Sequence, residues 1–251
     1  MKTETVERMD YYHIPQEFNK YINLEKKLIY SRYKFAVENI SNGSDLLEIG
    51  CGYGSGSKLL NDTGGKHKSY IGIDLSQDSI SAANDEYSEF GKFFESDAET
   101  LPVFQKDTFD NVISFENIEH LKNPRKSLIE IFRVLKSGGL LILSTPNRRN
   151  WGLADKNPFH YRHFSWCQII AEAEECGFDL VKSSGIYFSP SNFRLAVIFS
   201  VLGIDIKKLI NDVPTLLNLF FFLGRLFPKR ARLLLFVFKK RDGFPIEKYY
   251  Q

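Results

Sequence analysis

A cluster of glycines next to an acidic residue is the part of this sequence whose spacing points most directly to chemistry. Gly50, Gly52, Gly54 and Gly56 follow an apolar run that contains Glu48. Glycine destabilises regular structure because it adds backbone entropy to the unfolded chain. Such a cluster therefore indicates a loop whose bare backbone lies against a ligand, and loops of this kind hold nucleotide-containing cofactors.

Two common glycine loops do not fit this cluster. The dinucleotide pattern G-x-G-x-x-G would put its third glycine on Ser55 or Ser57, depending on the frame. The phosphate-binding pattern G-x-x-x-x-G-K-[ST] also fails, because Lys58 follows a serine. The glycine frames therefore disfavour a nicotinamide oxidoreductase. What remains is an acidic residue followed by glycines at alternate positions.

The elements around this loop alternate between strands and helices. The predicted strands are 46–49, 69–76, 92–98, 109–117 and 140–147, and the predicted helices are 16–39, 55–60, 76–91 and 123–139. Ser76 and Asn123-Pro124 are expected to begin two of the helices, and Gly138-Gly139 to end one. The alternation predicts a parallel sheet with helices on both faces. Ligands of such sheets bind at the carboxyl ends of the strands, so the residues just after each strand are the candidates.

The alternation loosens beyond residue 147. We predict a helix at 164–177, a strand at 178–188 and a last strand at 232–241, with an apolar, aromatic and basic stretch before the last strand. We expect one domain over residues 1–251. It comprises an N-terminal helical cap at 1–45, a cofactor-binding core at 46–188, a helical insertion at 189–231, and the last strand and tail at 232–251.

Several motifs in a fixed order carry a resemblance to a known family. E-x-G-x-G-x-G at 48–54, YIGID ending at Asp74, SDAETLP at 96–102, FDNVISFENIEHL and RVLKSGGLLILSTPN follow one another along the chain. In this order they resemble class I, Rossmann-like S-adenosylmethionine-dependent methyltransferases over residues 46–147. The resemblance implies a doubly wound α/β fold with a seven-stranded, mostly parallel sheet, an N-terminal helical cap and a helical insertion before an antiparallel last strand. It also implies S-adenosyl-L-methionine as the cofactor.

The resemblance further implies a set of cofactor-binding residues. These are Glu48, Gly50, Cys51, Gly52, Gly54, Asp74, Leu75, Asp97, Ala98, Glu99, Phe115 and Glu116. Asp74 would accept from the ribose hydroxyls, and Asp97 with the backbone of Ala98 would meet the adenine. Plainer interpretations stay open, with Glu48 as a surface charge, Asp74 as a helix cap and Cys51 as a small buried thiol.

Residues 157–166, NPFHYRHFSW, form a motif that bears on the acceptor, the molecule that would receive the methyl group. They resemble the pattern NPFH-x-[KR]-E-[FY] of bacterial small-molecule methyltransferases associated with surface-glycan synthesis, with His163 where that pattern has Glu. The resemblance implies a sugar hydroxyl of a glycan or its precursor as the acceptor. A phenolic or quinone-like lipid is the alternative, favoured by the apolar insertion. A non-catalytic protein that only binds the cofactor is a further alternative.

Three histidines are the candidates for a general base. His120 follows the fourth strand, and His160 and His163 lie in the acceptor motif. Their unperturbed pKa near neutrality suits proton removal from a hydroxyl. A histidine that bonds a loop carbonyl is the structural alternative. Glu116 and Glu119 are expected to orient a histidine or the substrate, and we predict no metal site.

Composition and the absence of certain motifs limit which partners and which cellular location we expect. The net charge of +2, and the absence of N-P-P-[FYW] after the fourth strand and of a Pro-Cys nucleophile, argue against nucleic acid. Three scattered cysteines favour a reducing compartment, and the N-terminus lacks the apolar core of a signal peptide, so we expect a cytoplasmic protein. The basic, apolar insertion predicts either a lid that rests on the inner membrane surface or a helical cap packed on the sheet.

Overall fold

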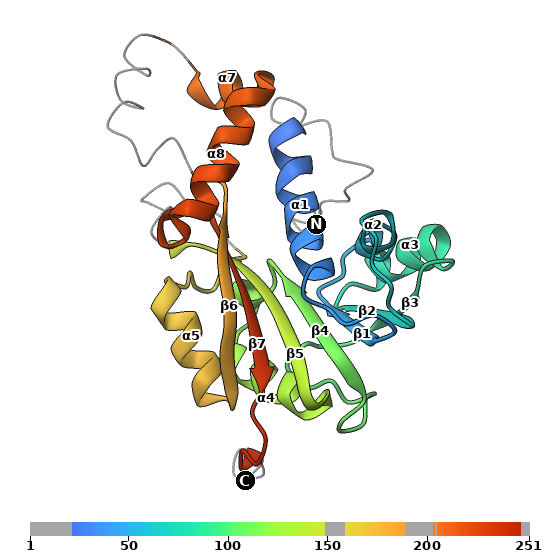
Figure 1. Cartoon of the computed structure of the whole chain (residues 1–251). Coiled ribbons are helices and arrows are strands. Elements are labelled where there is room, and N and C mark those ends of the chain that lie inside the picture. The colour runs from blue at the N-terminus through green and yellow to red at the C-terminus, as the bar shows by residue number, and fades with distance from the viewer. Residues whose placement is uncertain (1–21, 149–158, 189–202, 204, 247–251) are drawn as a thin grey trace.

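A seven-stranded sheet forms the centre of the computed structural model, which describes residues 22–148, 159–188, 203 and 205–246 (Figure 1). The strands are β1 Asp45–Ile49, β2 Ser69–Asp74, β3 Lys92–Glu95, β4 Phe109–Phe115, β5 Leu135–Pro146, β6 Phe178–Ile186 and β7 Leu233–Lys240. Their order is β3-β2-β1-β4-β5-β7-β6. Strands β1 to β5 pair in parallel, and β7 runs antiparallel between β5 and β6. The predicted mostly parallel sheet with an antiparallel last strand is confirmed.

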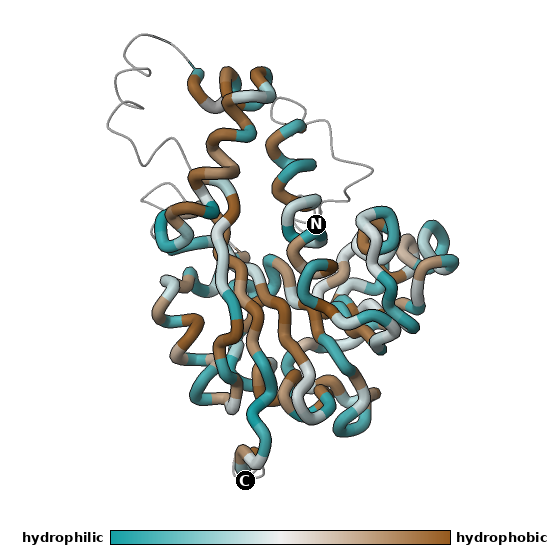
Figure 2. Tube along the Cα trace, viewed as in Figure 1, coloured by the Kyte–Doolittle hydropathy of each residue, from teal (hydrophilic) through white to brown (hydrophobic). Residues whose placement is uncertain are grey.

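Helices cover both faces of the sheet, as a doubly wound fold requires. They are α1 Ile22–Val37, α2 Ser55–Asp62, α3 Gln77–Tyr87, α4 Pro124–Val134, α5 Trp166–Glu175, α7 Ile206–Asp212 and α8 Pro214–Leu226, with 3-10 turns at η2 Ile118–His120 and η5 Pro228–Arg230. Helices α1, α2, α3, α7 and α8 share one hydrophobic core, and α4 and α5 share the other. The central strands, buried on both faces, are mostly apolar in Figure 2.

Local capping explains where several helices begin. Ser76 accepts from the Ser79 N–H at 3.3 Å before α3, as the sequence predicts. Asn123 caps α4 ahead of Pro124, which is also as predicted. Ser165 forms a capping box at the start of α5.

The predicted end of α4 is wrong. We expected the helix to continue to Gly138-Gly139, but it ends at Val134 and β5 begins at Leu135. Phe109 pairs with Leu135, whereas Asn111 pairs with Leu140, so β5 carries extra residues that form a bulge opposite β4. Pairing with β4 therefore outweighs the helical propensity of this stretch. The glycines belong to the bulge, not to a helix end.

Helices α1, α7 and α8 stand together beyond the carboxyl ends of the parallel strands (Figure 1). The side-chain oxygen of Asn211 accepts from the Leu24 N–H at 3.0 Å and so joins α7 to α1. The Phe188 N–H donates to the Phe220 carbonyl at 2.8 Å and joins α8 to the end of β6. The predicted helical insertion before the last strand thus contacts the N-terminal helix. Within the described residues, every helix is too short or too polar to cross a bilayer.

Candidate functional site

The loops that follow β1, β2 and β4 meet at the carboxyl edge of the sheet. The Gly50 and Cys51 N–H groups donate to the Ile73 carbonyl at 2.8 and 2.9 Å. The Gly52 N–H donates to Asp74 Oδ2 at 3.0 Å. Gly50 also lies against Asn117, in the loop after β4. The residues predicted from their positions after the strands are therefore brought together.

The glycines of the loop serve different purposes. A Cβ at Gly50 would lie 2.8 Å from Asn117 Oδ1, and one at Gly54 would lie 2.7 Å from Ala83 Cβ. A Cβ at Gly56 would collide with the Tyr33 hydroxyl. At Gly52, where φ is +53°, a Cβ would meet no described atom within 4 Å. The expectation that a ligand removes the side chains therefore suits Gly52, while the protein's own packing accounts for the others.

Glu48 joins three elements beneath the glycine loop. It is 1% exposed, and its Oε1 accepts from the Tyr33 hydroxyl of α1 at 2.5 Å. Its Oε2 accepts from the Tyr70 hydroxyl of β2. Burial raises the pKa of Glu48 to about 7, although both hydroxyls and Arg32 act in the opposite direction. The surface-charge interpretation is wrong, and a direct contact with a cofactor stays a prediction.

Asp74 is hydrogen-bonded to Gly52, and Leu75 follows Asp74 directly in the chain. The buried Asp74 carboxylate accepts from the Gly52 N–H and, through Oδ1, from the Ser76 N–H at 2.9 Å. These two bonds orient the carboxylate at the end of β2. Leu75 is 68% exposed, so an apolar surface lies next to an acidic group. That pairing suits an adenosine, which offers a hydroxylated ribose and a flat ring.

The segment after β3 supplies the other predicted adenine contacts. Asp97 is exposed and its Oδ1 accepts from the Glu99 N–H at 2.8 Å. Ala98 is buried. Glu99 Oε1 accepts from the Asn123 N–H at 2.9 Å, which ties this loop to the start of α4. The structure thus gives Glu99 a bracing role, which the sequence analysis did not foresee.

Glu116 occupies the end of β4 in a left-handed backbone conformation, with φ at +47°. The Ser144 hydroxyl donates to its Oε1 at 2.6 Å, and Arg32 of α1 forms an ion pair with Oε2 at 3.9 Å. Burial raises the pKa of Glu116, and Arg32 opposes that rise. A strained non-glycine residue held by several partners is typical of a functional site.

Two other predicted residues are packed into the core. The Phe115 ring lies edge-on to Tyr33 with centroids 5.3 Å apart. Cys51 is buried, and a Cβ added at Gly72 would lie 3.0 Å from its Sγ. Packing accounts for both side chains. Any contact of theirs with a cofactor stays a prediction.

The three predicted histidines form one cluster beside η2. The ring centroids of His120 and His160 are 4.7 Å apart, and those of His160 and His163 are 5.0 Å apart. His160 Nδ1 lies 2.9 Å from His163 Nε2, and His120 Nδ1 lies 3.2 Å from the Phe159 carbonyl oxygen. Residues distant in the sequence therefore share one site.

Glu119 lies buried next to this cluster. Its carbonyl accepts from the Tyr161 N–H at 3.0 Å, which holds the acceptor motif against η2. Its Oε2 accepts from the Thr145 hydroxyl at 3.0 Å. Burial raises the pKa of Glu119 well above its ordinary value, and Glu116 raises it further.

Sequence reasoning missed the roles of Arg32, Tyr33 and Tyr70. All three reach acidic residues of the site from other elements. Residue spacing alone does not pair a helix with a distant strand.

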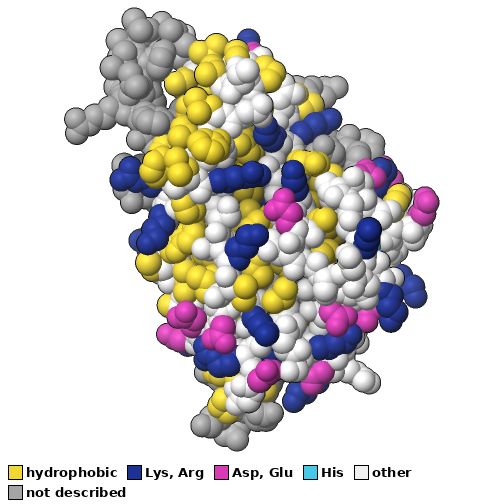
Figure 3. All heavy atoms as spheres, in the orientation of Figure 1, with side chains coloured by type: hydrophobic (Ala, Val, Ile, Leu, Met, Phe, Trp, Pro, Cys, Tyr) yellow, Lys and Arg dark blue, Asp and Glu magenta, His cyan; other side chains and the backbone are white. Residues whose placement is uncertain are grey.

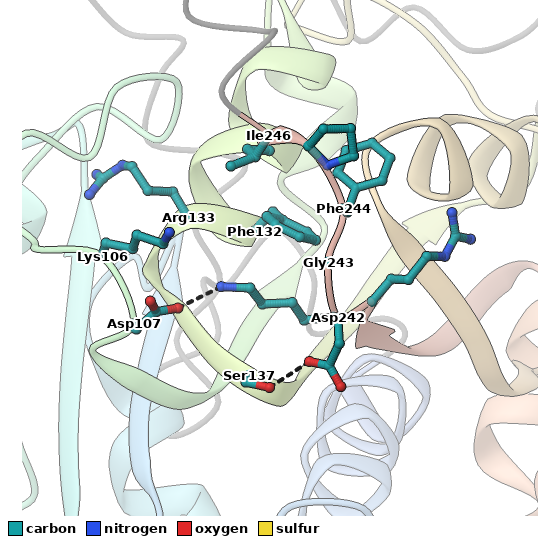
Figure 4. Close-up of a pocket in the computed structure, with 12 residues that line it drawn as sticks. Lys106, Asp107, Phe132, Arg133, Ser137, Asp242, Gly243, Phe244 and Ile246 are labelled. Atoms are coloured by element: carbon teal, nitrogen blue, oxygen red, sulfur yellow. Dashed lines mark hydrogen bonds and ion pairs between the residues drawn. The ribbon is translucent and has the colours of Figure 1, made fainter.

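A cavity of about 600 Å³ lies at the opposite edge of the sheet (Figure 4). It is formed where β4 and β5 begin and β7 ends, and its walls include Asp107, Ser137 and Lys240. Lys240 Nζ donates to Asp107 at 2.7 Å, so these opposite charges neutralise each other. The cavity is separate from the glycine loop, because that loop follows the carboxyl end of β1.

Comparisons with known proteins agree with this geometry. Residues 47–143 match a family model described as a methyltransferase domain. A Mycolicibacterium smegmatis protein named "Probable S-adenosylmethionine-dependent methyltransferase" is 27% identical over 198 residues, which are 76% of this chain and 75% of that protein. The ubiquinone biosynthesis O-methyltransferase of Coxiella burnetii is 25% identical over 177 residues, 63% of this chain and 74% of that protein.

The fold is also similar to solved structures. A chain in the complex between the Haloferax volcanii Trm112 methyltransferase activator and a methyltransferase has a TM-score of 0.65. Its sequence identity is 18%, and the match covers 86% of this chain and 91% of that chain. The sheet order and the glycine loop define a Rossmann-like α/β protein of the cofactor-binding type.

Together with the sequence relatives, these features identify the chain as an enzyme. It is an S-adenosylmethionine-dependent methyltransferase, and S-adenosyl-L-methionine is its cofactor.

Proposed function

We propose that this methyltransferase acts on a hydroxyl oxygen, with His120 as the base. The observation that supports this proposal is the 3.2 Å approach of His120 Nδ1 to the Phe159 carbonyl oxygen. A carbonyl oxygen only accepts hydrogen bonds, so Nδ1 carries the ring proton and Nε2 keeps a lone pair. A neutral imidazole of this tautomer accepts a proton from an alcohol near neutral pH.

The cofactor supplies a sulfonium-bound methyl group that is already electrophilic. The protein must therefore align the acceptor and exclude water. We assign the open side of Gly52 to the cofactor, Asp74 to its ribose hydroxyls and Leu75 to its adenine. Arg32 joins α1 to Glu116 and so holds the cap over the end of β4, where water would otherwise enter.

We assign the acceptor to a sugar hydroxyl of a glycan or its precursor. The support is the likeness of residues 157–166 to the motif of glycan-associated methyltransferases, of which residues 159–166 are described. The backbone of Tyr161 and Arg162 donates to the Glu119 carbonyl, at 3.0 and 3.4 Å. The motif thus lies beside His120, where an acceptor hydroxyl would need the base.

A phenolic or quinone-like lipid is the second candidate acceptor. Two observations favour it. One relative is named a ubiquinone biosynthesis O-methyltransferase. The other is an exposed apolar face on α8, which is described below.

Comparing the two substrate classes tests this proposal. Formation of S-adenosylhomocysteine would be followed with a panel of nucleotide-activated sugars and a panel of phenols and quinols. We expect turnover on a sugar hydroxyl, and we expect His120→Ala to lower kcat about 10²- to 10⁴-fold, the usual contribution of a base. His67→Ala is the matched control, because His67 precedes β2 and packs near Tyr70 instead. Turnover on phenols alone would move the assignment to the second class, and an unchanged kcat in His120→Ala would refute the base.

We also propose that the enzyme works at the cytoplasmic surface of the membrane and contacts it through α8. The exposed apolar residues are Leu219, Phe222, Leu226 and Phe227. The first three recur at helical spacing, so they share one face. Exposed basic residues lie beside them at Arg225, Lys229 and Arg230. Figure 3 shows this mixture of apolar and basic side chains over α8, a combination that suits anionic lipid headgroups.

Flotation with vesicles tests the membrane contact. The full chain should float with vesicles that contain phosphatidylglycerol and stay at the bottom with phosphatidylcholine alone. Phe222→Asp with Leu226→Asp should abolish flotation. Val181→Asp is the control, since it changes an exposed apolar residue of β6 away from α8. Failure of the wild-type chain to bind anionic vesicles would end this proposal and leave the helices as a packed cap.

A further inference from the structure

We propose that Glu119, His120 and His160 bind a divalent transition-metal ion beside the acceptor site. Each residue offers one ligand atom, and these three atoms lie within 4.8 Å of one another. Two of the ligands come from η2 and one from the acceptor motif. The hydrogen bond from the Tyr161 N–H to the Glu119 carbonyl, at 3.0 Å, holds these two segments together. No metal site is predicted from the sequence, because the residue pattern alone does not bring these two segments into contact.

The carboxylate of Glu119 is the first independent support for the site. Glu119 is 1% exposed, and its Oε2 accepts from the Thr145 hydroxyl. Its Oε1 is buried and has no hydrogen-bond partner in the described part of the chain. A buried carboxylate oxygen without a partner is costly, and a bound cation removes that cost. The orphaned oxygen belongs to the residue that lies next to the two imidazoles.

The outer contacts of the histidines are the second support. Ligand histidines usually engage their second ring nitrogen in a hydrogen bond, which fixes the tautomer and the ring orientation. His120 Nδ1 has the Phe159 carbonyl at 3.2 Å, and His160 Nδ1 has His163 Nε2 at 2.9 Å. When both Nδ1 atoms donate, the Nε2 atoms present their lone pairs. His163 then acts as a positioning residue, not a ligand.

The donor set selects the class of metal. Two imidazoles and one carboxylate are typical of sites for zinc and other first-row transition metals, whereas magnesium and calcium prefer oxygen ligands throughout. Three protein ligands also leave coordination positions for a hydroxyl oxygen. This part of the inference rests on the proposed function and refines the role of His120 in it. With an ion bound, the Nε2 lone pair of His120 would hold the ion, and the ion would lower the pKa of the acceptor hydroxyl, whose proton would then leave to solvent.

Metal titration of the untagged chain tests the site. After treatment with a chelator, the protein would be titrated with Co²⁺ while visible absorption is recorded, and with Zn²⁺ by calorimetry. We expect one ion per chain. Removing one of three ligands, by Glu119→Gln or His160→Ala, should weaken binding by at least about 100-fold, because even outer partners contribute about 10- to 100-fold. His67→Ala should bind like wild type, and His163→Ala should show the smaller loss of an outer partner.

Binding of S-adenosylhomocysteine is the folding control for every variant. A variant that binds this nucleoside normally but not the metal shows that the loss is local. The inference is overturned if the wild-type chain takes up no stoichiometric Co²⁺ or Zn²⁺, or if Glu119→Gln binds the ions equally well. Stoichiometric metal binding with no turnover on any hydroxyl would support the site and refute the proposed function. If chelators leave hydroxyl turnover unchanged in a chain without bound metal, the proposed function is supported and the metal site is refuted.

Discussion

Replacing Glu48 by glutamine is expected to remove a pH dependence from the stability of the fold. Glu48 is buried beneath the glycine loop, and both of its oxygens accept from tyrosine hydroxyls. Glutamine has nearly the same shape and keeps one carbonyl oxygen for these donors, but it cannot ionise. The variant should therefore fold and lose only the titration.

The sign and size of the effect follow from the pKa of Glu48. Burial raises it from 4.5 to about 7 in the folded protein. Between these values the folded chain keeps the proton and the unfolded chain releases it. The stabilising contribution is therefore fully present below the unfolded pKa and is lost as the pH rises through the folded pKa. The full loss for this buried group amounts to about 3 kcal/mol of unfolding free energy.

Urea denaturation at a series of pH values from about 5 to 8 would measure this loss, because the linear dependence on urea gives the free energy of unfolding at each pH. The quantity of interest is the difference between wild type and Glu48→Gln as a function of pH. Glu89→Gln, at an exposed position after α3, is the control. Parallel pH profiles of wild type and Glu48→Gln would refute the assignment of a raised pKa to Glu48.

Four further changes separate binding from stability. Gly52→Val should abolish S-adenosylhomocysteine binding in calorimetry, because its side chain would enter the open space that we assign to the cofactor. The φ of +53° adds local strain for valine in this loop, but no atom within 4 Å collides with the Cβ, so the circular dichroism of the sheet should stay unchanged; retained binding would mean that the cofactor lies elsewhere. Gly54→Ala should instead lower the unfolding free energy by about 2–4 kcal/mol, since its Cβ would collide with Ala83, and an unchanged urea midpoint would contradict this. Asp74→Asn should weaken S-adenosylhomocysteine binding about 10- to 100-fold, because an amide cannot accept from two N–H groups through both of its polar atoms; wild-type affinity would count against the role of Asp74. Ser165→Ala should cost about 1 kcal/mol in urea denaturation through the lost cap of α5, with nucleoside binding as the control that should not change.

The order of strands and helices could be predicted because local signals mark it. Apolar runs bounded by glycine, and caps such as Ser76 and Asn123, act over a few residues. The boundary between α4 and β5 could not be predicted in the same way. No helix breaker precedes Leu135, and it is the pairing with Phe109 on another strand that ends the helix there.

The candidate site likewise has residues that could be predicted from the sequence and residues that could not. The residues after the strands were found because parallel strands end at a common edge. The partners of Glu48 lie on α1 and β2, and nothing in their spacing indicates that two hydroxyls meet one carboxylate. Likewise, His120 and His160 come together through a backbone bond of Glu119, which is invisible in a residue pattern.

The two tyrosine hydroxyls that donate to Glu48 limit how the N-terminal helix could be exchanged in protein engineering. Tyr33 belongs to the N-terminal helix, and the adjacent Arg32 forms an ion pair with Glu116, which directly follows β4. Exchanging this helix for one without these two residues would leave the buried Glu48 and the partly exposed Glu116 without their partners from α1. A successful chimera would have to carry both residues along or replace Glu48 and Glu116 at the same time. The N-terminal helix and the core residues that it contacts would therefore have to be exchanged together.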